Sequence, residues 1–304
     1  MKTKQVRSDL VSRNLGLCAA WLFLVLATSA SATPVTSNLV FWIDAADPAN
    51  TGVTPAIDNT ALATWVNKAP ALQQNGIPSV VQNTVGSQPL IKTGANGLNG
   101  LPVVRFDGND DFMQSANAFT PTLAQPTEVF IVWKGDSIGG IGAVAYDGFT
   151  ANGRHTMAYE STGEGTGIDL GATTAGVFNG TGLYVTAFPT AIYATARYSG
   201  GTASLRINGV DQALSDSSIG TDALDGVTIG GRFDAFMGDR FSLHGYIAEM
   251  LIYSSPLSTG PGGDREAVEA YLNNKWFVPI PEPSCFSLIA AASIVALRRR
   301  RAQG

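Results

Sequence analysis

Hydrophobic positions in this chain form short runs that are rich in β-branched residues and are separated by glycine-containing turns. Residues 128–133 (EVFIVW) are almost continuously apolar, which is typical of a strand covered on both faces. A longer run at 243–253 (LHGYIAEMLIY) is apolar on both faces except for Glu249. Short strands separated by turns in this way predict an all-β sandwich or barrel.

The clearest predicted hairpin begins at residue 203. Residues 203–207 (ASLRI) alternate between apolar and polar side chains, so they predict a strand with one buried face. Asn208-Gly209 follows, and this pair readily takes the positive φ angles that a two-residue type I′ turn requires. We therefore expect the chain to reverse there and to return as a second strand from Val210.

The hydrophobic period changes near the end of the domain. Pro261-Gly262-Gly263 breaks the chain, and Asp264 is placed to cap a helix. Apolar residues then recur at three- and four-residue steps, which is the spacing of one helical face: Ala267, Val268, Tyr271, Leu272 and Trp276. We expect a single amphipathic helix that closes the domain against the sandwich.

The first 32 residues have the organisation of a secretory signal peptide. Four basic residues precede an apolar stretch at 15–27, and the small residues Ala30 and Ala32 mark a cleavage site. The mature chain is therefore expected to begin near Thr33 and to leave the cytoplasm.

The end of the chain combines three features in order, a Pro-Glu-Pro motif, an apolar run and a basic cluster: Pro281, Glu282 and Pro283, then 284–297, then Arg298, Arg299, Arg300 and Arg301. The two prolines favour an extended peptide that a protease could bind. As a helix the apolar run would span about 21 Å, against a hydrocarbon core of about 30 Å, so it is short for a permanent anchor. A buried core helix followed by a disordered basic end is the alternative interpretation.

This tail resembles the PEP-CTERM sorting signal of Gram-negative bacteria that make extracellular polysaccharide. The resemblance implies cleavage by an exosortase-type processing enzyme after a transient stay in the inner membrane. The expected organisation is a signal peptide at 1–32, one sandwich domain at 33–278 and the sorting signal at 279–304. The resemblance also implies secretion through the inner membrane to the cell surface or extracellular matrix.

Charge is distributed unevenly along the chain. Residues 33–279 carry 11 Lys plus Arg and 22 Asp plus Glu, so their net charge is 11 − 22 = −11, against −5 for the whole chain. Such an acidic domain argues against nucleic acid as a partner and suits solubility or the binding of cations. Both cysteines, Cys18 and Cys285, lie in the terminal segments, so the domain has neither a disulfide nor a thiolate zinc site.

Three segments of the domain are similar to the LamG-like jelly-roll, or concanavalin A-like lectin and glucanase, superfamily: 39–48 (LVFWIDAADP), 97–108 (GLNGLPVVRFDG) and 245–253 (GYIAEMLIY). The resemblance implies two antiparallel sheets packed face to face. The expected fold is therefore a two-sheet antiparallel jelly-roll sandwich with one C-terminal amphipathic helix. Lectins, glycosidases, adhesion modules and spacers all use this sandwich, so it implies no single function.

Asp107, Asn109 and Asp111 form the richest cluster of oxygen ligands in the sequence. They alternate in a loop that follows a predicted strand, and calcium takes six to eight such ligands. The loop could therefore supply part of a calcium shell. The alternative interpretation is a plain turn between strands, because Asp-Gly and Asn-Asp sequences also favour turns.

One segment of the sequence matches a catalytic motif of serine hydrolases. Residues 135–139 (GDSIG) match the G-x-S-x-G pattern of a hydrolase, but the residues that follow are glycine-spaced and do not favour the required helix. His155 and His244 are the only histidines, and neither lies in a recognisable catalytic motif. These residues therefore argue against a serine hydrolase.

Glycoside hydrolysis needs two carboxylates about 5–10 Å apart. The E-x-D-x-x-E arrangement of the glucanase branch is absent, and Glu160 and Glu164 lie in a glycine-rich segment. Glu249 is better interpreted as a structural carboxylate, hydrogen-bonded or paired with an arginine such as Arg105.

No catalytic residues are assigned from the sequence. The leading hypothesis is a non-enzymatic binding or structural protein, with extracellular polysaccharide as the partner that the resemblance suggests. The alternative is a polysaccharide-active glycoside hydrolase or lyase on the same fold. Aromatic residues that could stack on sugar rings, if exposed, are Trp65, Tyr159, Tyr184 and Phe236.

Overall fold

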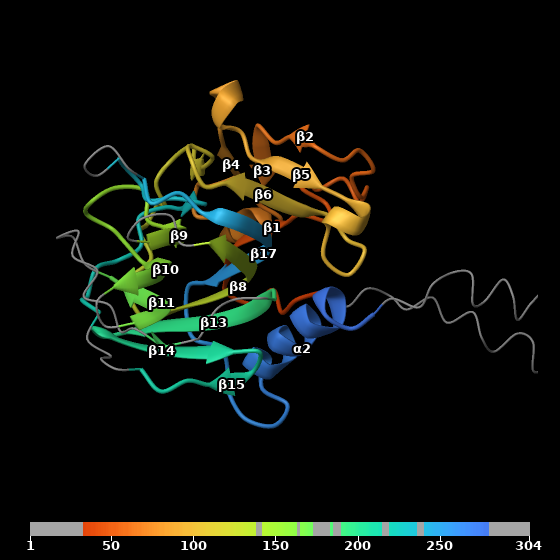
Figure 1. Ribbon diagram of the computed structural model, residues 1–304. Helices are drawn as coiled ribbons and strands as arrows, with labels where there is room; N and C mark the ends of the chain where they lie inside the picture. The colour runs from red at the N-terminus through yellow and green to blue at the C-terminus, as the bar shows by residue number, and fades with distance from the viewer. Residues whose placement is uncertain are drawn as a thin grey trace, which may run out of the picture. The chain divides into compact units, whose positions relative to one another are not determined.

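The computed structural model describes residues 33–137, 142–162, 165–172, 183–184, 190–214, 219–235 and 240–279 (Figure 1). Within these ranges the chain forms two antiparallel sheets and one α-helix, as the sequence predicts. Several predicted features lie outside the described residues: the signal peptide with Ala30 and Ala32, the sorting motif at 281–283 and 298–301, and Ile138, Gly139, Glu164 and Phe236. Among the described residues, no helix has both the length and the apolar character needed to cross a membrane.

Sheet A has nine strands, with β15-β14-β13-β8-β17-β6-β5-β2 in spatial order and β1 paired with β17. In chain order they are β1 (Leu39–Asp44), β2 (Thr60–Ala61), β5 (Leu90–Lys92), β6 (Val103–Asp107), β8 (Thr127–Ser137), β13 (Ile192–Ser199), β14 (Thr202–Ile207), β15 (Val210–Asp211) and β17 (His244–Tyr253). The long strand β17 pairs with β8 on one side. On the other side it pairs first with β6 and then with β1.

Sheet B has eight strands in the spatial order β12-β11-β10-β9-β16-β7-β4-β3. In chain order they are β3 (Thr64–Val66), β4 (Ser79–Val81), β7 (Met113–Ser115), β9 (Gly142–Asp147), β10 (Thr156–Thr162), β11 (Gly165–Gly171), β12 (Leu183–Tyr184) and β16 (Thr228–Ile229). Three short 3-10 helices connect strands of the N-terminal half: η1 (Ala71–Gln73), η2 (Val85–Ser87) and η3 (Gly94–Asn96).

Large apolar side chains fill the space between the sheets. Phe106 and Trp133 of sheet A and Met113 and Tyr146 of sheet B are fully buried in one cluster. Burial of such a side chain contributes about 1.5–3 kcal/mol relative to exposure, so this layer supplies much of the stability. The run at 128–133 is buried throughout, which confirms the predicted strand covered on both faces.

The predicted hairpin is confirmed. Asn208 and Gly209 take φ angles of 50° and 77°, and Ile207 pairs with Val210 across the turn. Leu205 is buried, whereas the flanking apolar residues of β14 are only partly buried because this strand lies near the edge of sheet A.

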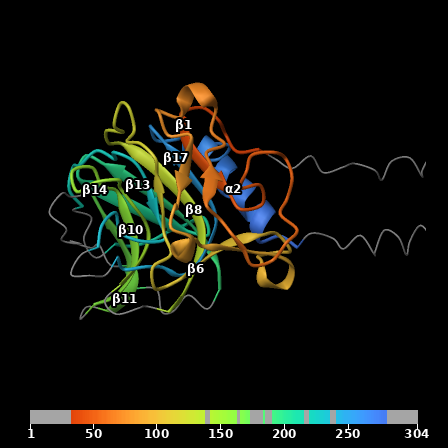
Figure 2. The same ribbon diagram turned by 90° about the horizontal axis from the view of Figure 1, so that it is seen from above.

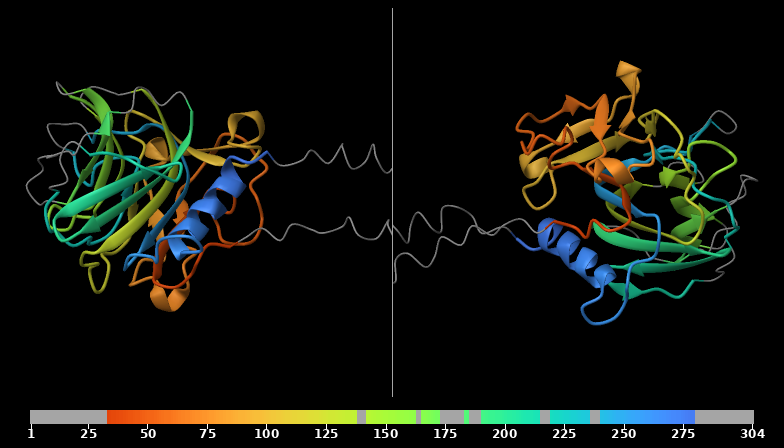
Figure 3. Two further views of the ribbon diagram at one scale, coloured as in Figure 1. Left: turned by 90° about the horizontal axis from the view of Figure 1, so that it is seen from below. Right: turned by 180° about the vertical axis from the view of Figure 1, so that it is seen from behind.

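The predicted helix, α2 (Asp264–Trp276), lies along the outer face of sheet A (Figures 2 and 3). Two details of the prediction are wrong. Gly263, not Asp264, is the N-cap, and the N–H of Asp264 donates to Ser258 Oγ at 2.9 Å. Ala267 is exposed. The buried face of the helix combines two charged residues with four others: Arg265, Val268, Glu269, Tyr271, Leu272 and Trp276.

Candidate functional site

The outer face of sheet A has two parts, and α2 covers the first. Four ion pairs join this helix to the sheet beneath it: Glu128 with Arg265 at 2.5 Å, Arg206 with Glu269 at 2.9 Å, and Lys275 with both Glu249 and Asp44, each at 2.8 Å. The helix supplies the cation in three pairs and the carboxylate in the fourth. Because α2 occupies this part of the face, a ligand of sheet A must bind elsewhere on it.

Glu249 is a structural residue at the centre of the covered part. Its fully buried carboxylate accepts hydrogen bonds from both indoles of Trp42 and Trp276, at 2.7 and 2.6 Å, and from Tyr271 Oη at 2.7 Å. Burial raises the pKa of Glu249, while the charge of Lys275 and the hydrogen bonds from Lys275 and Tyr271 act in the opposite direction. The predicted structural role is confirmed, whereas the suggested partner Arg105 is wrong.

The second part of the outer face is not covered by α2 and carries polar side chains in two rows. In the first row Tyr246 of β17 lies between two cations. It pairs with Arg105 of β6 on one side and with Lys134 of β8 on the other. In the second row Asp107 lies opposite His244, and Asp136 occupies the bulge where β8 meets the start of β17. We call these six residues the outer polar surface.

Asp136 joins the two cations of the outer polar surface. Its carboxylate pairs with Lys134 Nζ at 2.7 Å and with Arg105 Nη1, while Arg105 Nη2 lies 2.9 Å from His244 Nε2. Partial burial pushes the pKa of Asp136 upward, but the hydrogen bonds from Lys134 and Arg105 outweigh it and lower that pKa. The side chains remain 23–28% exposed, so a ligand can reach them.

Tyr246 is the aromatic residue of the outer polar surface. Its half-buried ring packs against the core, and burial together with the charge of Asp136 raises its pKa to about 12. The phenol therefore stays protonated and can both donate and accept a hydrogen bond at physiological pH. Next to it, Gly245 permits close pairing of β17 and β8, because a Cβ there would overlap the carbonyl oxygen of Lys134.

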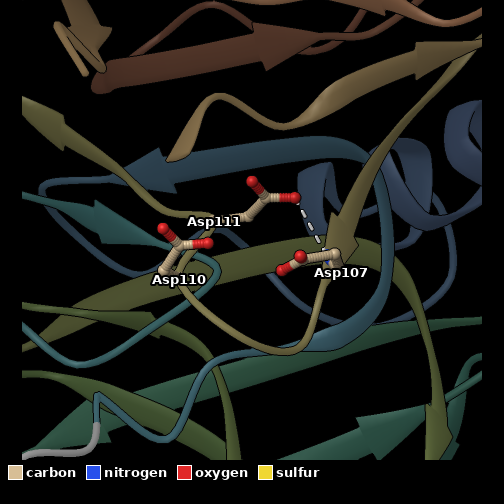
Figure 4. A group of neighbouring side chains, drawn as sticks. All are labelled: Asp107, Asp110 and Asp111. Atoms are coloured by element: carbon tan, nitrogen blue, oxygen red, sulfur yellow. Dashed lines mark hydrogen bonds between the residues drawn. The ribbon is translucent and has the colours of Figure 1, made fainter. Parts of the chain in front are cut away.

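An acidic loop adjoins the outer polar surface at the end of β6. Carboxylate oxygens of Asp107, Asp110 and Asp111 lie within 4.8 Å of one another (Figure 4). Asp111 Oδ2 accepts the N–H of Asp107 at 2.9 Å. Burial, and then the negative charges of Asp107 and Asp110, raise the pKa of Asp111 to about 6. Among the described residues, none of these three carboxylates forms a salt bridge with a lysine or arginine.

Asn109, the third residue of the predicted ligand set, is hydrogen-bonded to Asp107. Asn109 donates to Asp107 from its backbone N–H at 2.8 Å and from its side-chain amide at 2.9 Å, which closes a turn with Gly108 at a φ of 82°. Asp110, which the alternating spacing passes over, lies beside Asp107 and Asp111 as a further carboxylate. The backbone therefore forms a turn, and the carboxylates of the loop could supply part of a calcium shell.

The remaining sequence candidates do not assemble a site among the described residues. Residues 135–137 lie in β8, at its junction with β17. His155 is buried between Thr127 Oγ1 and the carbonyl oxygen of Asp222, each at 2.9 Å, and burial lowers its pKa to about 4. Trp65 and Tyr159 are core residues, 0% and 5% exposed, so they are wrong as sugar-stacking candidates. The side chains of Glu160 and Tyr184 lie outside the described residues.

No protein family model matches the chain, and no curated protein sequence matches it. Solved structures align with it at low identity. A sialidase of Trypanosoma rangeli aligns at 10% identity and a TM-score of 0.49, covering 88% of this chain and 39% of the sialidase, so the chain spans about two fifths of that protein. Domain 4 of AbnA, an extracellular arabinanase of Geobacillus stearothermophilus in complex with arabinotriose, aligns at 13% identity and a TM-score of 0.45. The alignment covers 72% of this chain and 93% of that domain. The CBM40 domain of a Ruminococcus gnavus sialidase aligns at 15% identity and a TM-score of 0.38, covering 55% of this chain and 95% of that domain.

Proposed function

We propose that this chain is a non-enzymatic polysaccharide-binding protein of the cell surface or extracellular matrix, and that it binds through the outer polar surface. The observation that carries the proposal is the position of Tyr246 between Arg105 and Lys134, on a part of sheet A that α2 leaves uncovered. A sugar ring presents apolar C–H groups and hydroxyl groups together. A tyrosine ring with neighbouring charged hydrogen-bonding groups matches both.

Paired strands and ion pairs hold the side chains of the outer polar surface in place, which favours ligand binding. Arg105, Lys134 and Tyr246 come from three adjacent strands whose registers are fixed by backbone pairing. Asp136 and His244 hold the guanidinium of Arg105 from two sides. Side chains that are already ordered lose little conformational entropy when a ligand binds, so such a surface is preorganised.

The use of the buried carboxylates supports binding rather than hydrolysis. A glycosidase needs one carboxyl group as the acid and a second as the base or nucleophile, both reaching the substrate. Glu128, Glu249 and Glu269 instead accept hydrogen bonds between sheet A and α2. Asp147 accepts two from Arg154, at 2.9 and 2.8 Å. These four acids are committed to holding the fold together.

Native affinity electrophoresis through gels that contain single polysaccharides tests the binding function. We expect the protein to be retarded by at least one polymer and to release no reducing or unsaturated ends from it. Depolymerisation would support the glycoside hydrolase or lyase alternative instead. Migration unchanged in every gel would contradict the proposal.

Delivery to the surface is a separate part of the proposal. The signal peptide at 1–32 would direct export, and an exosortase-type enzyme would cleave near Pro281, Glu282 and Pro283 and release the chain from the inner membrane. Mass spectrometry of the protein from a host that has the processing enzyme should give termini near Thr33 and near 281–283. A chain that still ended in its arginine cluster would contradict this part.

A further inference from the structure

We propose that the outer polar surface selects uncharged polysaccharide and rejects acidic polysaccharide, with Asp136 and the acidic loop as the repulsive elements. The inference rests on the proposed function and assigns the chemical class of the ligand. Specificity of this kind arises when a site places groups against the wrong ligand as well as for the right one.

Negative charges outnumber positive charges around Tyr246. Arg105 and Lys134 supply two positive charges. Asp136 and the three carboxylates of the acidic loop supply four negative charges when ionised, so the local balance is 2 − 4 = −2. The wider domain has the same sign, at −11 over residues 33–279. A polymer that carries carboxylate groups therefore meets repulsion both at long range and at the surface itself.

The two cations do not compensate for this repulsion, because they already share an anion. Asp136 pairs with Lys134 at 2.7 Å and also with Arg105. A ligand carboxylate that bound the remaining N–H donors would lie beside Asp136 and be repelled by it, unless it displaced Asp136 from two charge-assisted hydrogen bonds. A sugar hydroxyl can use the same donors without this repulsion, since a guanidinium has five N–H donors and an ammonium has three.

Polymers that share a backbone and differ in the charge of their substituents provide the test. We would compare hydroxyethyl cellulose with carboxymethyl cellulose, and dextran with carboxymethyl dextran, in affinity electrophoresis with EDTA present. The expected result is that the neutral member binds and that its carboxymethyl form binds about three- to thirtyfold more weakly in 20 mM salt. The difference should shrink at about 0.3 M salt, because salt screens repulsion between exposed charges.

Substitution of an acidic residue locates the repulsion. Asp110→Asn removes one charge of the acidic loop and should bring the two affinities closer by about two- to threefold, whereas Asp211→Asn should leave their ratio unchanged. Asp211 is the matched control because its side chain is 80% exposed on β15, at the far edge of sheet A. The salt dependence of the unmodified protein shows separately, without any variant, that the discrimination is electrostatic.

The outcomes separate the two proposals. Equal or tighter binding of the carboxymethyl forms by the unmodified protein would overturn the selection of uncharged polysaccharide and would leave polysaccharide binding in place. Failure to bind any of the four polymers would count against the proposed function itself.

Discussion

Lys275 Nζ lies 2.8 Å from Glu249 Oε2 and 2.8 Å from Asp44 Oδ1, so one ammonium near the end of α2 joins the helix to two strands of sheet A. Asp44 is also bonded to Lys68, at 2.9 Å. All of these groups are buried or nearly so. A charge removed here leaves its partner without compensation in a region that water does not reach.

Glu249→Gln is therefore expected to destabilise the protein by about 3–5 kcal/mol, the usual cost of breaking a buried ion pair from one side. Equilibrium unfolding in urea measures the loss. The amide keeps the shape of the carboxylate, so the loss reports the charge and its hydrogen bonds. Glutamine would remove one of the two negative charges paired with Lys275, and its NH₂ group would face either the donors of Trp42 and Tyr271 or those of Lys275 and Trp276.

Two further variants complete this experiment. In the double variant with Lys275→Met, the cost should be less than the sum of the single costs, because neither charge is then left unpaired. Asp211→Asn removes the exposed partner of Arg206 and should cost less than about 1 kcal/mol. Similar losses for Glu249→Gln and Asp211→Asn would show that the buried network contributes no more than a surface pair.

The protein should lose stability in weak acid, because His155 is buried. Full burial lowers its pKa from 6.5 to about 4, so between those values the unfolded chain binds a proton that the folded chain does not. The contribution of neutral His155, about 3 kcal/mol, is thus present above pH 6.5 and is lost as the pH falls toward 4. His155→Gln should flatten the stability profile across this window in urea unfolding at several pH values. A profile unchanged by the substitution would contradict the assignment.

Calcium should stabilise the acidic loop at neutral pH. The pKa of Asp111 is raised to about 6, so the folded chain takes up a proton more readily than the unfolded chain between about pH 4 and 6. The stability that this proton supplies is lost as the pH rises through 6, where three carboxylates then repel one another. A bound cation offsets that repulsion, so millimolar calcium should raise the melting temperature at pH 7.5 relative to EDTA.

The same measurement at pH 4.5 is the control for calcium, because Asp111 is then protonated and the effect should largely disappear. Asp111→Asn should remove the calcium effect at both pH values. A melting temperature at pH 7.5 that is the same in calcium and in EDTA would mean that the loop is only a turn.

Gly245 is expected to be irreplaceable in β17. Gly245→Ala would force its Cβ into the carbonyl oxygen of Lys134 and separate the strands that carry the outer polar surface, so both stability and binding should fall. Gly171→Ala in β11 is the matched control, because open space surrounds that position and its φ is not positive. We expect the control to be neutral or slightly stabilising in thermal unfolding. Equal melting temperatures for the two variants would contradict the close approach at Gly245.

Local sequence patterns predicted those elements whose cause is local. The hairpin at Asn208-Gly209, the strand at 128–133 and the helix after Gly263 each follow from a period or a turn signal within about a dozen residues. The partners of Glu249 could not be predicted in this way. Trp42 lies 207 residues away in sequence, and only the pairing of β1 with β17 brings it close.

The outer polar surface also escaped sequence analysis, although a signal was present. Arg105, Lys134 and Tyr246 are polar or amphipathic residues in otherwise apolar strands. Their grouping depends on registers that bulges shift at two places along β17 and β8, and no local pattern specifies such bulges. In the acidic loop, the closeness of Asp110 to Asp107 and Asp111 also depends on the turn and could not be inferred from the alternating spacing.

Tyr246→Ala in affinity electrophoresis tests the central claim most directly. Leu72→Ala is the control, because Leu72 is the most exposed large apolar side chain among those described and lies in η1, outside the outer polar surface. Loss of a central aromatic contact should weaken polysaccharide binding by about tenfold while Leu72→Ala binds normally. If Tyr246→Ala keeps its fold by circular dichroism and binds polysaccharide as tightly as the unmodified protein, this surface is not the binding site.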